Sequence, residues 1–411
     1  MAQPSQPSYP HVRFGEDLAQ ALSDHPTIAI AELLFISLSL LCLLHAFTTS
    51  RSHIVVWVSA ITSGTMNDLF FMYLPFSDNF WHAQATIMLS PRLPLYIPAA
   101  YSVFQYVGVA TAFRLPSTYV AGRCAYAALV SCFFYALYDL VGARYLWWTW
   151  HSTDAAVFHR WAGVPIGSTM WTLIHVAVFT AIIQWSVVGR RKCGVVELVF
   201  RGVVWTGILC TPLMMAGMGP FQLHQLRFNW YPPAITQFPG RPDSIAISLV
   251  ITLFSYVSRP ALSVTRARAT TSDYALFGGC FLFLVGLLAV TYVFDPSEVV
   301  STGIHQTQGP CDEIGYDISG YERFTYFCSD KKKPQFSDRY FSLCKNSKKD
   351  LKHGVEWYTV CGKGGGRNHV VAGVLTCISA YLLMPLCVQR RWAGIWPYGW
   401  MKGGKNKVKN A

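Results

Sequence analysis

The sequence predicts an all-α membrane protein, a polytopic bundle of about nine transmembrane helices with one disulfide-containing lumenal or extracellular loop. The 411-residue chain is 52% hydrophobic and only 13% charged, whereas a soluble domain has about 25% charged residues. Apolar runs of roughly 20 residues, the length needed to cross a bilayer core, recur along the chain. Lys and Arg gather in alternate turns between these runs, as they do in the cytosolic loops of membrane proteins.

The nine expected spans divide the chain into five parts. Residues 1–26 form a polar N-terminal segment, and residues 27–294 form a membrane core of eight spans. Residues 295–368 form an outer loop, residues 369–389 the ninth span, and residues 390–411 a basic tail. The expected spans are residues 27–47, 53–75, 94–113, 120–142, 165–187, 196–217, 243–262, 274–294 and 369–389.

The charge distribution predicts the orientation. The turns after spans 1, 3, 5, 7 and 9 are rich in Lys and Arg, so we expect them in the cytosol, with the C-terminus inside and the N-terminus lumenal or external. No cleavable signal peptide is expected, because further spans follow the first apolar run. The net charge of +12 is explained by this pattern, so membrane lipids are the expected partners and nucleic acid is not.

The C-terminal tail supplies a localisation signal. Lys409 and Lys407 are the third and fifth residues from the end, which resembles the dilysine signal that returns membrane proteins to the endoplasmic reticulum. A generic basic tail at an anionic lipid surface is the alternative. The sequence therefore favours the endoplasmic reticulum.

The outer loop contains four cysteines. In an oxidising compartment such a segment is expected to form two disulfides, for which three pairings are open. A zinc site is the rival interpretation, but the loop has no CxxC pair and its spacings are wide. The four residues are Cys311, Cys328, Cys344 and Cys361.

The segments that follow spans 2 and 4 resemble each other. Each has an Asp-Leu pair near the end of its span, then Trp-His, then Arg, then Pro at the start of the next span. An internal duplication of helix pairs is one explanation. The other is convergence, because interfacial loops favour Trp and Pro suits a first helical turn. In chain order the two copies read Asp68, Trp81, His82, Arg92 and Pro94, and Asp139, Trp150, His151, Arg160 and Pro165.

These segments supply the candidate catalytic residues. Asp68 and Asp139 lie in spans, where an acid usually faces the bundle interior or a water-filled cavity, and a buried acid suits proton donation. His82 and His151 could assist them. The alternative for the acids is a structural role, either pairing with an arginine or capping a helix.

The same loops supply candidate substrate-binding residues. Arg and His beside Trp could hold a polar headgroup at the membrane interface. No histidine-box spacing of the type found in membrane di-iron desaturases is present, so no metal is expected, and the cofactor is unknown. A lone His175 within a span is expected to bond to a neighbouring helix. The substrate-binding candidates are Trp81, Arg92, Trp150, Asp154, His159 and Arg160.

Two family resemblances follow from these motifs. NFWHAQATIMLSPRLPLYI at residues 79–97 and YDLVGARYLWWTWHSTDAA with GVPIGSTMW within residues 138–171 resemble an uncharacterised family of multi-pass membrane proteins of animals and protists, over roughly residues 27–260. That family brings no activity. YDLVGARYLWWTW followed by GVPIGSTMW also looks like the membrane carotenoid hydratases, although this chain is longer, with extra spans and a disulfide loop. That resemblance implies that Asp139 and Asp68 handle protons while water is added to an isoprenoid double bond.

The sequence leaves the function between three classes, and whether the protein is an enzyme stays open. The first is acid-base chemistry, of a hydration or isomerisation type, on a lipid or isoprenoid in an outward-facing polar pocket formed by the loops after spans 2, 4 and 6. The second is a non-enzymatic transporter or binding protein for a lipid or hydrophobic small molecule. The third is an assembly factor of the endoplasmic reticulum. An enzyme is expected to bring Asp139, His151 and His82 within a few Å of one another.

Overall fold

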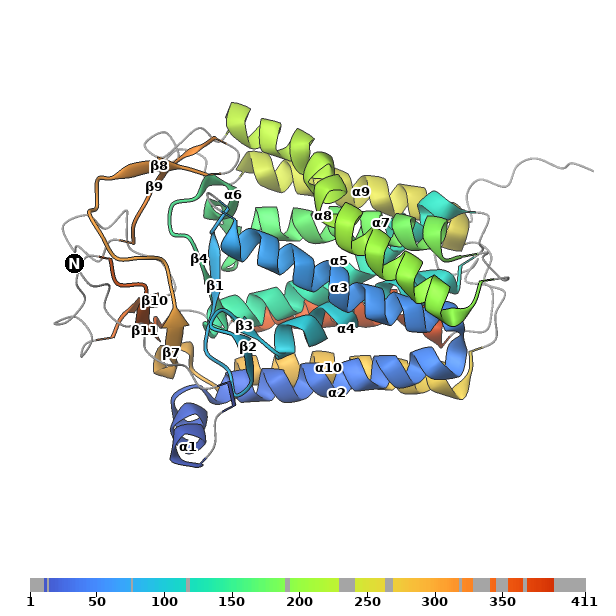
Figure 1. The fold of residues 1–411 in the computed structure, drawn as a ribbon, viewed down its shortest axis with the longest axis horizontal. Coiled ribbons are helices and arrows are strands. Elements are labelled where there is room, and N and C mark those ends of the chain that lie inside the picture. Colours follow the sequence, from blue (N-terminus) through green and yellow to red (C-terminus); the bar gives the residue numbers. More distant parts are fainter. Residues whose placement is uncertain are drawn as a thin grey trace, which may run out of the picture.

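The helices lie side by side in one bundle, and short strands gather at one end of it (Figure 1). The computed structural model describes residues 11–12, 15–74, 77–115, 119–188, 193–228, 241–262, 269–317, 320–327, 341–344, 354–364 and 368–387. The helices are α1 (Gly15–Asp24), α2 (Pro26–Thr49), α3 (Arg51–Tyr73), α4 (Tyr96–Phe113), α5 (Val120–Arg144), α6 (Ala155–Phe158), α7 (Ile166–Ser186), α8 (Val195–Phe228), α9 (Arg241–Leu262), α10 (Thr271–Val293) and α11 (His369–Leu382), with short 3₁₀ turns η2 (Pro296–Glu298) and η5 (Met384–Leu386). The strands are β1 (Phe80–His82), β2 (Met88–Ser90), β3 (Leu93–Pro94), β4 (Trp148–Trp150), β5 (Arg160–Trp161), β6 (Val164–Pro165), β7 (Val300–Ile304), β8 (Ile314–Tyr316), β9 (Glu322–Phe324), β10 (Phe341–Leu343) and β11 (Trp357–Gly362).

Seven helices in the described part of the chain are long and apolar enough to cross a membrane. The protein is therefore a multi-pass membrane protein, but the expectation of nine spans was wrong. The helices α4 and α9, expected as the third and seventh spans, are not among these seven in the described part of the chain. The seven are α2, α3, α5, α7, α10, the segment Val195–Leu223 of α8 and the segment His369–Leu386 that begins with α11.

The burial of its side chains explains why α4 is less apolar than the seven candidate spans. Nearly every residue of α4 is buried, and it packs against α2, α3 and α5. Because α4 faces protein rather than lipid, it can carry polar residues such as Gln105 and Tyr106. The helix α9 carries Asp243 near its start and Arg259 near its end.

The helix α5 forms the centre of the bundle. It packs against α4, α7, α9 and α11, and 83% of its most apolar window is buried. Its outer end is fixed by neighbours: the Tyr145 hydroxyl donates to the carbonyls of Val290 (3.2 Å) and Phe294 (3.0 Å) of the α10 region. The Trp147 indole donates to Thr27 Oγ1 of α2 at 3.0 Å. The chain therefore leaves α5 in a defined direction toward β4.

The loops after α3 and α5 have equivalent local structures and pair with each other. Each loop contains a strand (β1 or β4), then a two-stranded hairpin (β2–β3 or β5–β6) that ends in Pro where the next helix begins. The strands β1 and β4 form an antiparallel pair, with Phe80 opposite Trp150 and His82 opposite Trp148. The two similar segments of the sequence are thus neighbours in space.

The outer loop forms β-structure, so the all-α expectation was wrong for this part of the chain. The strands β10, β11 and β7 form a three-stranded antiparallel sheet, and β8 pairs with β9. The sheet contacts the membrane-proximal loops where Gln84 N–H donates to the Thr302 carbonyl at 2.8 Å. A Cβ atom at Gly303 would lie 3.1 Å from the His82 carbonyl oxygen, so glycine allows this close approach.

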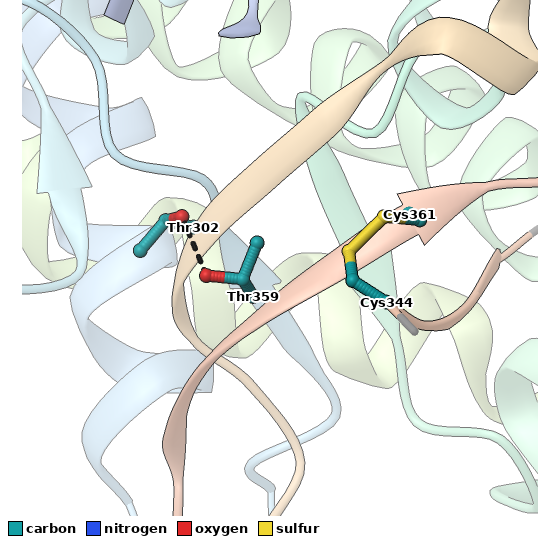
Figure 2. The surroundings of a disulfide bond; sticks show 4 residues. All are labelled: Thr302, Cys344, Thr359 and Cys361. Carbon is teal, nitrogen blue, oxygen red and sulfur yellow. Dashed lines mark hydrogen bonds between the residues drawn. A yellow bond between two sulfur atoms is a disulfide. The ribbon is translucent and has the colours of Figure 1, made fainter. Parts of the chain in front are cut away.

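A disulfide stabilises this sheet. Figure 2 shows Cys344, beside β10, bonded to Cys361 of β11, near the hydrogen bond between Thr302 and Thr359. Cys311 is also disulfide-bonded, whereas Cys328 lies outside the described residues. The prediction that the loop cysteines form disulfides is confirmed for the bridge between Cys344 and Cys361.

The structure describes the two ends of the chain to different extents. The N-terminal segment includes the helix α1, and α2 begins with Pro26, where the His25 ring accepts from Ile28 N–H at 3.3 Å. The basic tail, with Lys407 and Lys409, lies outside the described residues. The strands of the loops after α3 and α5 and the outer sheet, formed by β7, β10 and β11, lie at one end of the bundle (Figure 1). That this end faces the lumen or exterior stays a prediction.

Candidate functional site

A cavity of about 160 Å³ lies among the helices near the end that bears the strands. A cavity needs only about 10–15 Å³ to hold a water molecule, so this one can accept a small molecule or a lipid head. Aromatic side chains form much of its wall, and no Lys or Arg among the described residues lines it. The lining residues come from α3 (Asn67, Asp68, Phe71), β1 and the residue before it (Asn79, Phe80, His82), α4 (Ile97, Ala100, Tyr101, Phe104), α5 (Tyr135, Tyr138), β4 (Trp148, Trp150), α6 (Ala156, Val157), α7 (Gly167, Ser168, Trp171) and α8 (Met214, Met215, Met218, Phe221, Gln222).

Backbone periodicity selects which side chains reach the cavity. Alternate residues of a strand point to opposite faces, and the pairing of β1 with β4 places Phe80, His82, Trp148 and Trp150 on the cavity side. The helices contribute residues three or four positions apart, which share one face of a helix. Examples are Tyr101 with Phe104, Tyr135 with Tyr138, Ser168 with Trp171, and Met214 with Met218.

Asp68 reaches the cavity wall from α3. It is 3% exposed, and its Oδ1 accepts a short hydrogen bond from the Tyr101 hydroxyl of α4. The Tyr101 ring lies directly over Gly64, one helical turn before Asp68, where an added Cβ would overlap the ring. Glycine at this position therefore lets Tyr101 approach α3 closely enough to contact the acid.

Asp139 lies behind the wall, on α5. Its Oδ2 accepts from the Ser168 hydroxyl of α7 at 2.7 Å, and Ser168 lines the cavity. Its Oδ1 is buried without a hydrogen-bond partner among the described residues, as is the hydroxyl of the neighbouring Tyr138, which lines the cavity. Arg144 donates to the Lys363 carbonyl at 2.9 Å, so Asp139 is bonded to a serine rather than to this arginine.

Asp68 and Asp139 are alike in lacking an ion pair among the described residues. Within the described residues, neither Asp68 nor Asp139 has a cationic side chain within the 4 Å distance of an ion pair. Both are held by hydroxyl groups. A buried carboxylate without a positive partner is costly in free energy, so this arrangement favours either a protonated acid or a cation close by.

His82 is the candidate histidine that the structure places in the cavity wall. Its Nδ1 lies 3.1 Å from the Arg92 carbonyl oxygen, which fixes the ring. Burial lowers the pKa of His82 to about 3, against the opposing effect of the hydrogen bond to the Arg92 carbonyl. His82 is therefore neutral at physiological pH and adds no positive charge to the cavity.

His151 faces away from the cavity. It follows Trp150 at the end of β4 and lies on the face that the outer sheet covers, with its Nε2 2.9 Å from Gln306 Nε2. Trp81 lies on the same face, its ring centroid 6.1 Å from that of His151. Burial, followed by the charge of Arg323, lowers the pKa of His151. Asp68 and His82 share the cavity wall, but His151 does not join them there.

Most of the remaining candidates contact other protein groups. Arg92 joins α3 to β1, donating to the Met72 carbonyl (2.7 Å), Asp78 Oδ1 (2.5 Å) and the Phe80 carbonyl (2.9 Å). Asp154 caps α6 and pairs with Arg323 of β9 at 3.1 Å.

Two further candidates lie close to the cavity, outside its lining. The Arg160 guanidinium lies 5.5 Å from the Trp150 ring centroid. His159 is buried, and this burial lowers its pKa. Their predicted roles in substrate binding stay predictions.

Beside the cavity wall at Trp171, polar side chains of α3, α4 and α7 contact one another inside the bundle. The Ser63 hydroxyl donates to Gln105 Oε1 at 2.9 Å, and Gln105 Nε2 lies 3.2 Å from His175 Nε2. The His175 ring stacks on Trp171 of the cavity wall, with 4.8 Å between ring centroids. The expectation that His175 bonds to a neighbouring helix is confirmed.

Sequence reasoning missed most of the cavity wall. Tyr101, Tyr135, Ser168 and Trp171 look like ordinary residues of apolar helices, and the wall is completed only when five long helices, the short helix α6 and a strand pair come together. The spacing of Tyr101 with Phe104 and of Tyr135 with Tyr138 was the available signal. In the described part of the chain, no group of three His, Cys, Asp or Glu side chains could hold a metal ion.

Comparison with known proteins shows a family but no activity. The family model for a domain of unknown function, DUF7802, matches residues 14–386, so the chain belongs to this family. The match extends well beyond the residues expected from the sequence motifs. No curated protein and no solved structure is significantly similar to the chain.

Proposed function

We propose that this DUF7802 protein binds an amphiphilic, lipid-like small molecule in the cavity between α3, α4, α5, α7 and α8. The proposal rests on the residues that surround this cavity within a bundle of membrane helices. Among the described residues, aromatic and methionine side chains and one acid, Asp68, line the cavity, and a second acid, Asp139, lies directly behind Ser168. Ligand sites are typically apolar with a few polar groups that fix orientation. The methionines of α8 add an adaptable wall.

The apolar part of the ligand would lie against α8. Met214, Met218 and Phe221 form the wall on this helix, and Pro212 and Pro220 lie within it. The polar part of the ligand would then reach toward Asp68 of α3 and Ser168 of α7, the two helices that pack against α8.

Photo-crosslinking of lipid analogues tests the proposal. Purified protein in lipid nanodiscs would be exposed to a diazirine-bearing fatty alcohol and a diazirine-bearing isoprenoid alcohol, and the labelled peptides would be identified by mass spectrometry. We expect label on the α8 or α4 residues that line the cavity. The variant Ala100→Phe, which places a ring in the cavity from α4, should lose most of that label.

The control is Ala216→Phe. Ala216 is exposed on α8, so the same substitution there adds a ring toward lipid and should leave the label unchanged. Both variants must give the same monodisperse gel-filtration peak as the wild type. Equal labelling of the wild type and Ala100→Phe would exclude the cavity as the binding site.

A second function, acid-base catalysis on the bound molecule, is favoured by the unpaired Oδ1 of Asp139. An acid whose other oxygen is held by Ser168 could exchange a proton through that hydroxyl with a substrate. The likeness to carotenoid hydratases favours an isoprenoid double bond as the reacting group. Because His151 faces the outer sheet, Asp139, Asp68 and His82 are the residues left for this role.

Comparison of lipid and pigment extracts from cells that carry wild-type protein or Asp139→Asn tests this second function. A catalyst should cause substrate to accumulate and product to disappear in the variant. Unchanged extracts, with Asp139→Asn still labelled by the photoreactive lipid, would leave binding in place and exclude catalysis by Asp139.

A further inference from the structure

We infer that the head of the bound amphiphile is a cation, namely an ammonium group, and that the aromatic cavity with Asp68 recognises its charge. This inference rests on the proposed function and identifies the ligand class for the same cavity. Three features of the cavity indicate a cationic head: the charges of its wall, its aromatic rings and the Tyr138 hydroxyl, which has no hydrogen-bond partner among the described residues.

The described lining of the cavity offers an acid and no cationic side chain. Asp68 lines the wall, and His82 is neutral because burial lowers its pKa to about 3. Asp139 lies behind Ser168, outside the lining, where the charge of Arg160 acts on it. A phosphate or carboxylate head would face Asp68 with no Lys or Arg in the described lining. A cationic head would supply the positive partner that Asp68 lacks among the described residues, in a medium where opposite charges attract strongly.

The aromatic rings form a second recognition element. Tyr138 contacts Tyr135 edge to face, with centroids 5.4 Å apart, and Trp148 in a tilted arrangement, with centroids 4.8 Å apart. The ring of Trp171 lies 6.2 Å from that of Tyr135 and 6.2 Å from that of Tyr101. Rings arranged around a pocket attract a cation through their negative faces, and such aromatic cages bind quaternary ammonium ligands.

The unpartnered hydroxyl of Tyr138 is the third element. Tyr138 is 3% exposed, lines the cavity, and has no hydrogen-bond partner for its hydroxyl among the described residues. A buried polar group without a partner is unfavourable. An ammonium head near α5 would place its positive charge beside this oxygen, so one ligand group would compensate both Asp68 and Tyr138.

A competition experiment with matched ten-carbon amphiphiles tests the inference. Decyltrimethylammonium, decanol and decanoate carry a positive, neutral and negative head on the same chain. Each would compete with the photoreactive fatty alcohol for wild-type protein in nanodiscs. We expect the cation to displace the label at a concentration about tenfold lower than decanol, since a desolvated cation–π contact contributes about 1.4 kcal/mol or more, and decanoate to be the weakest competitor.

Variants of two lining residues then test whether the preference for the cation over decanol arises in the cavity. Asp68→Asn keeps the shape of the side chain and removes its charge, so the ratio between cation and decanol should fall several-fold. Tyr138→Phe keeps the ring but removes the hydroxyl and should lower the ratio in part, whereas Tyr138→Leu removes both and should lower it further. Because each ratio is measured in the same membranes, differences in partitioning of the competitors cancel between variants.

The outcomes separate the two proposals. If decanol competes as well as decyltrimethylammonium while the label still depends on Ala100, the cavity binds amphiphiles but the cationic head is wrong. If Ala100→Phe does not reduce the label, the proposed function fails and this inference fails with it. A preference for the cation that is unchanged in Asp68→Asn and in Tyr138→Leu would also overturn the inference.

Discussion

Asp68 and Asp139 are held by hydroxyl groups, and this determines what their substitution should do. Tyr101 donates to Asp68, and Ser168 donates to Asp139. An asparagine can accept the same hydrogen bonds through its carbonyl oxygen. Substitution of either acid by Asn therefore changes charge and proton exchange with little change of shape, which makes these variants suitable for testing function.

The buried histidines at the strand end predict an acid-sensitive fold. Burial lowers the pKa of His305 to about 4 and that of His82 to about 3, whereas an unfolded histidine titrates near 6.5. A lowered folded pKa means that stability is fully present above pH 6.5 and is lost as the pH falls toward the folded pKa. We expect the melting temperature of the purified protein to fall between about pH 6.5 and pH 4.

Variants at His305 check the cause of this pH dependence. Its Nδ1 lies 3.2 Å from Thr149 Oγ1, and asparagine or glutamine can retain a hydrogen bond there without titrating. His305→Gln should flatten the melting profile between pH 6.5 and pH 4. A profile as steep as that of the wild type would show that other groups cause the acid sensitivity.

Among the elements, α4 is the helix that the sequence describes least well. It has the length of a short span, but it lies inside the bundle and carries Tyr101, Gln105 and Tyr106, which bond to α3, α7 and α2. Its packing against α3 depends on Gly64, over which the Tyr101 ring lies. The position of this ring also sets the contact with Asp68.

Gly64→Ala should therefore damage both packing and binding. Overpacking of a buried contact usually costs about 1–3 kcal/mol, so we expect a lower melting temperature and weaker labelling of the cavity. Gly278→Ala is the matched control, because nothing lies within 4 Å of an added Cβ at that position in α10. It should be neutral or slightly stabilising, since alanine favours a helix by about 1 kcal/mol over glycine. Equal melting temperatures for the two variants would contradict this account of α3 and α4.

The strands explain why only part of the candidate site was predictable. The repeated Trp-His motif indicated two related loops, and these loops do pair. Antiparallel pairing, however, sets Phe80 opposite Trp150 and His82 opposite Trp148. Equivalent positions in the sequence therefore face opposite sides, so His82 reaches the cavity and His151 reaches the outer sheet.

At the scale of the whole molecule, the disulfide indicates in which compartment the outer sheet lies. Cys344 and Cys361 are joined across a sequence separation of 17 residues, and such a bridge contributes about 3 kcal/mol in the loop-entropy model. Disulfides persist in oxidising compartments. This supports the prediction that the strand-bearing end faces the lumen or exterior.

A thiol-labelling experiment checks that prediction. Cys344→Ser should leave Cys361 open to a membrane-impermeant maleimide added on the lumenal or external side, and it should lower the melting temperature. Cys377→Ser is the matched control, because Cys377 is a free, exposed cysteine on α11 and its loss should create no new labelled site. Labelling of Cys361 from the cytosolic side alone would reverse the predicted orientation.

The sequence by itself determined the class of the protein, the apolar helices, the two related loops and the disulfide loop. These follow from composition and local periodicity, which act over a few residues. Only the tertiary structure decided that α4 lies inside the bundle, that the outer loop forms a sheet, and that Tyr101 and Ser168 bond to Asp68 and Asp139. Those features depend on contacts between distant helices and on strand register, and neither leaves a pattern in a single segment of the chain.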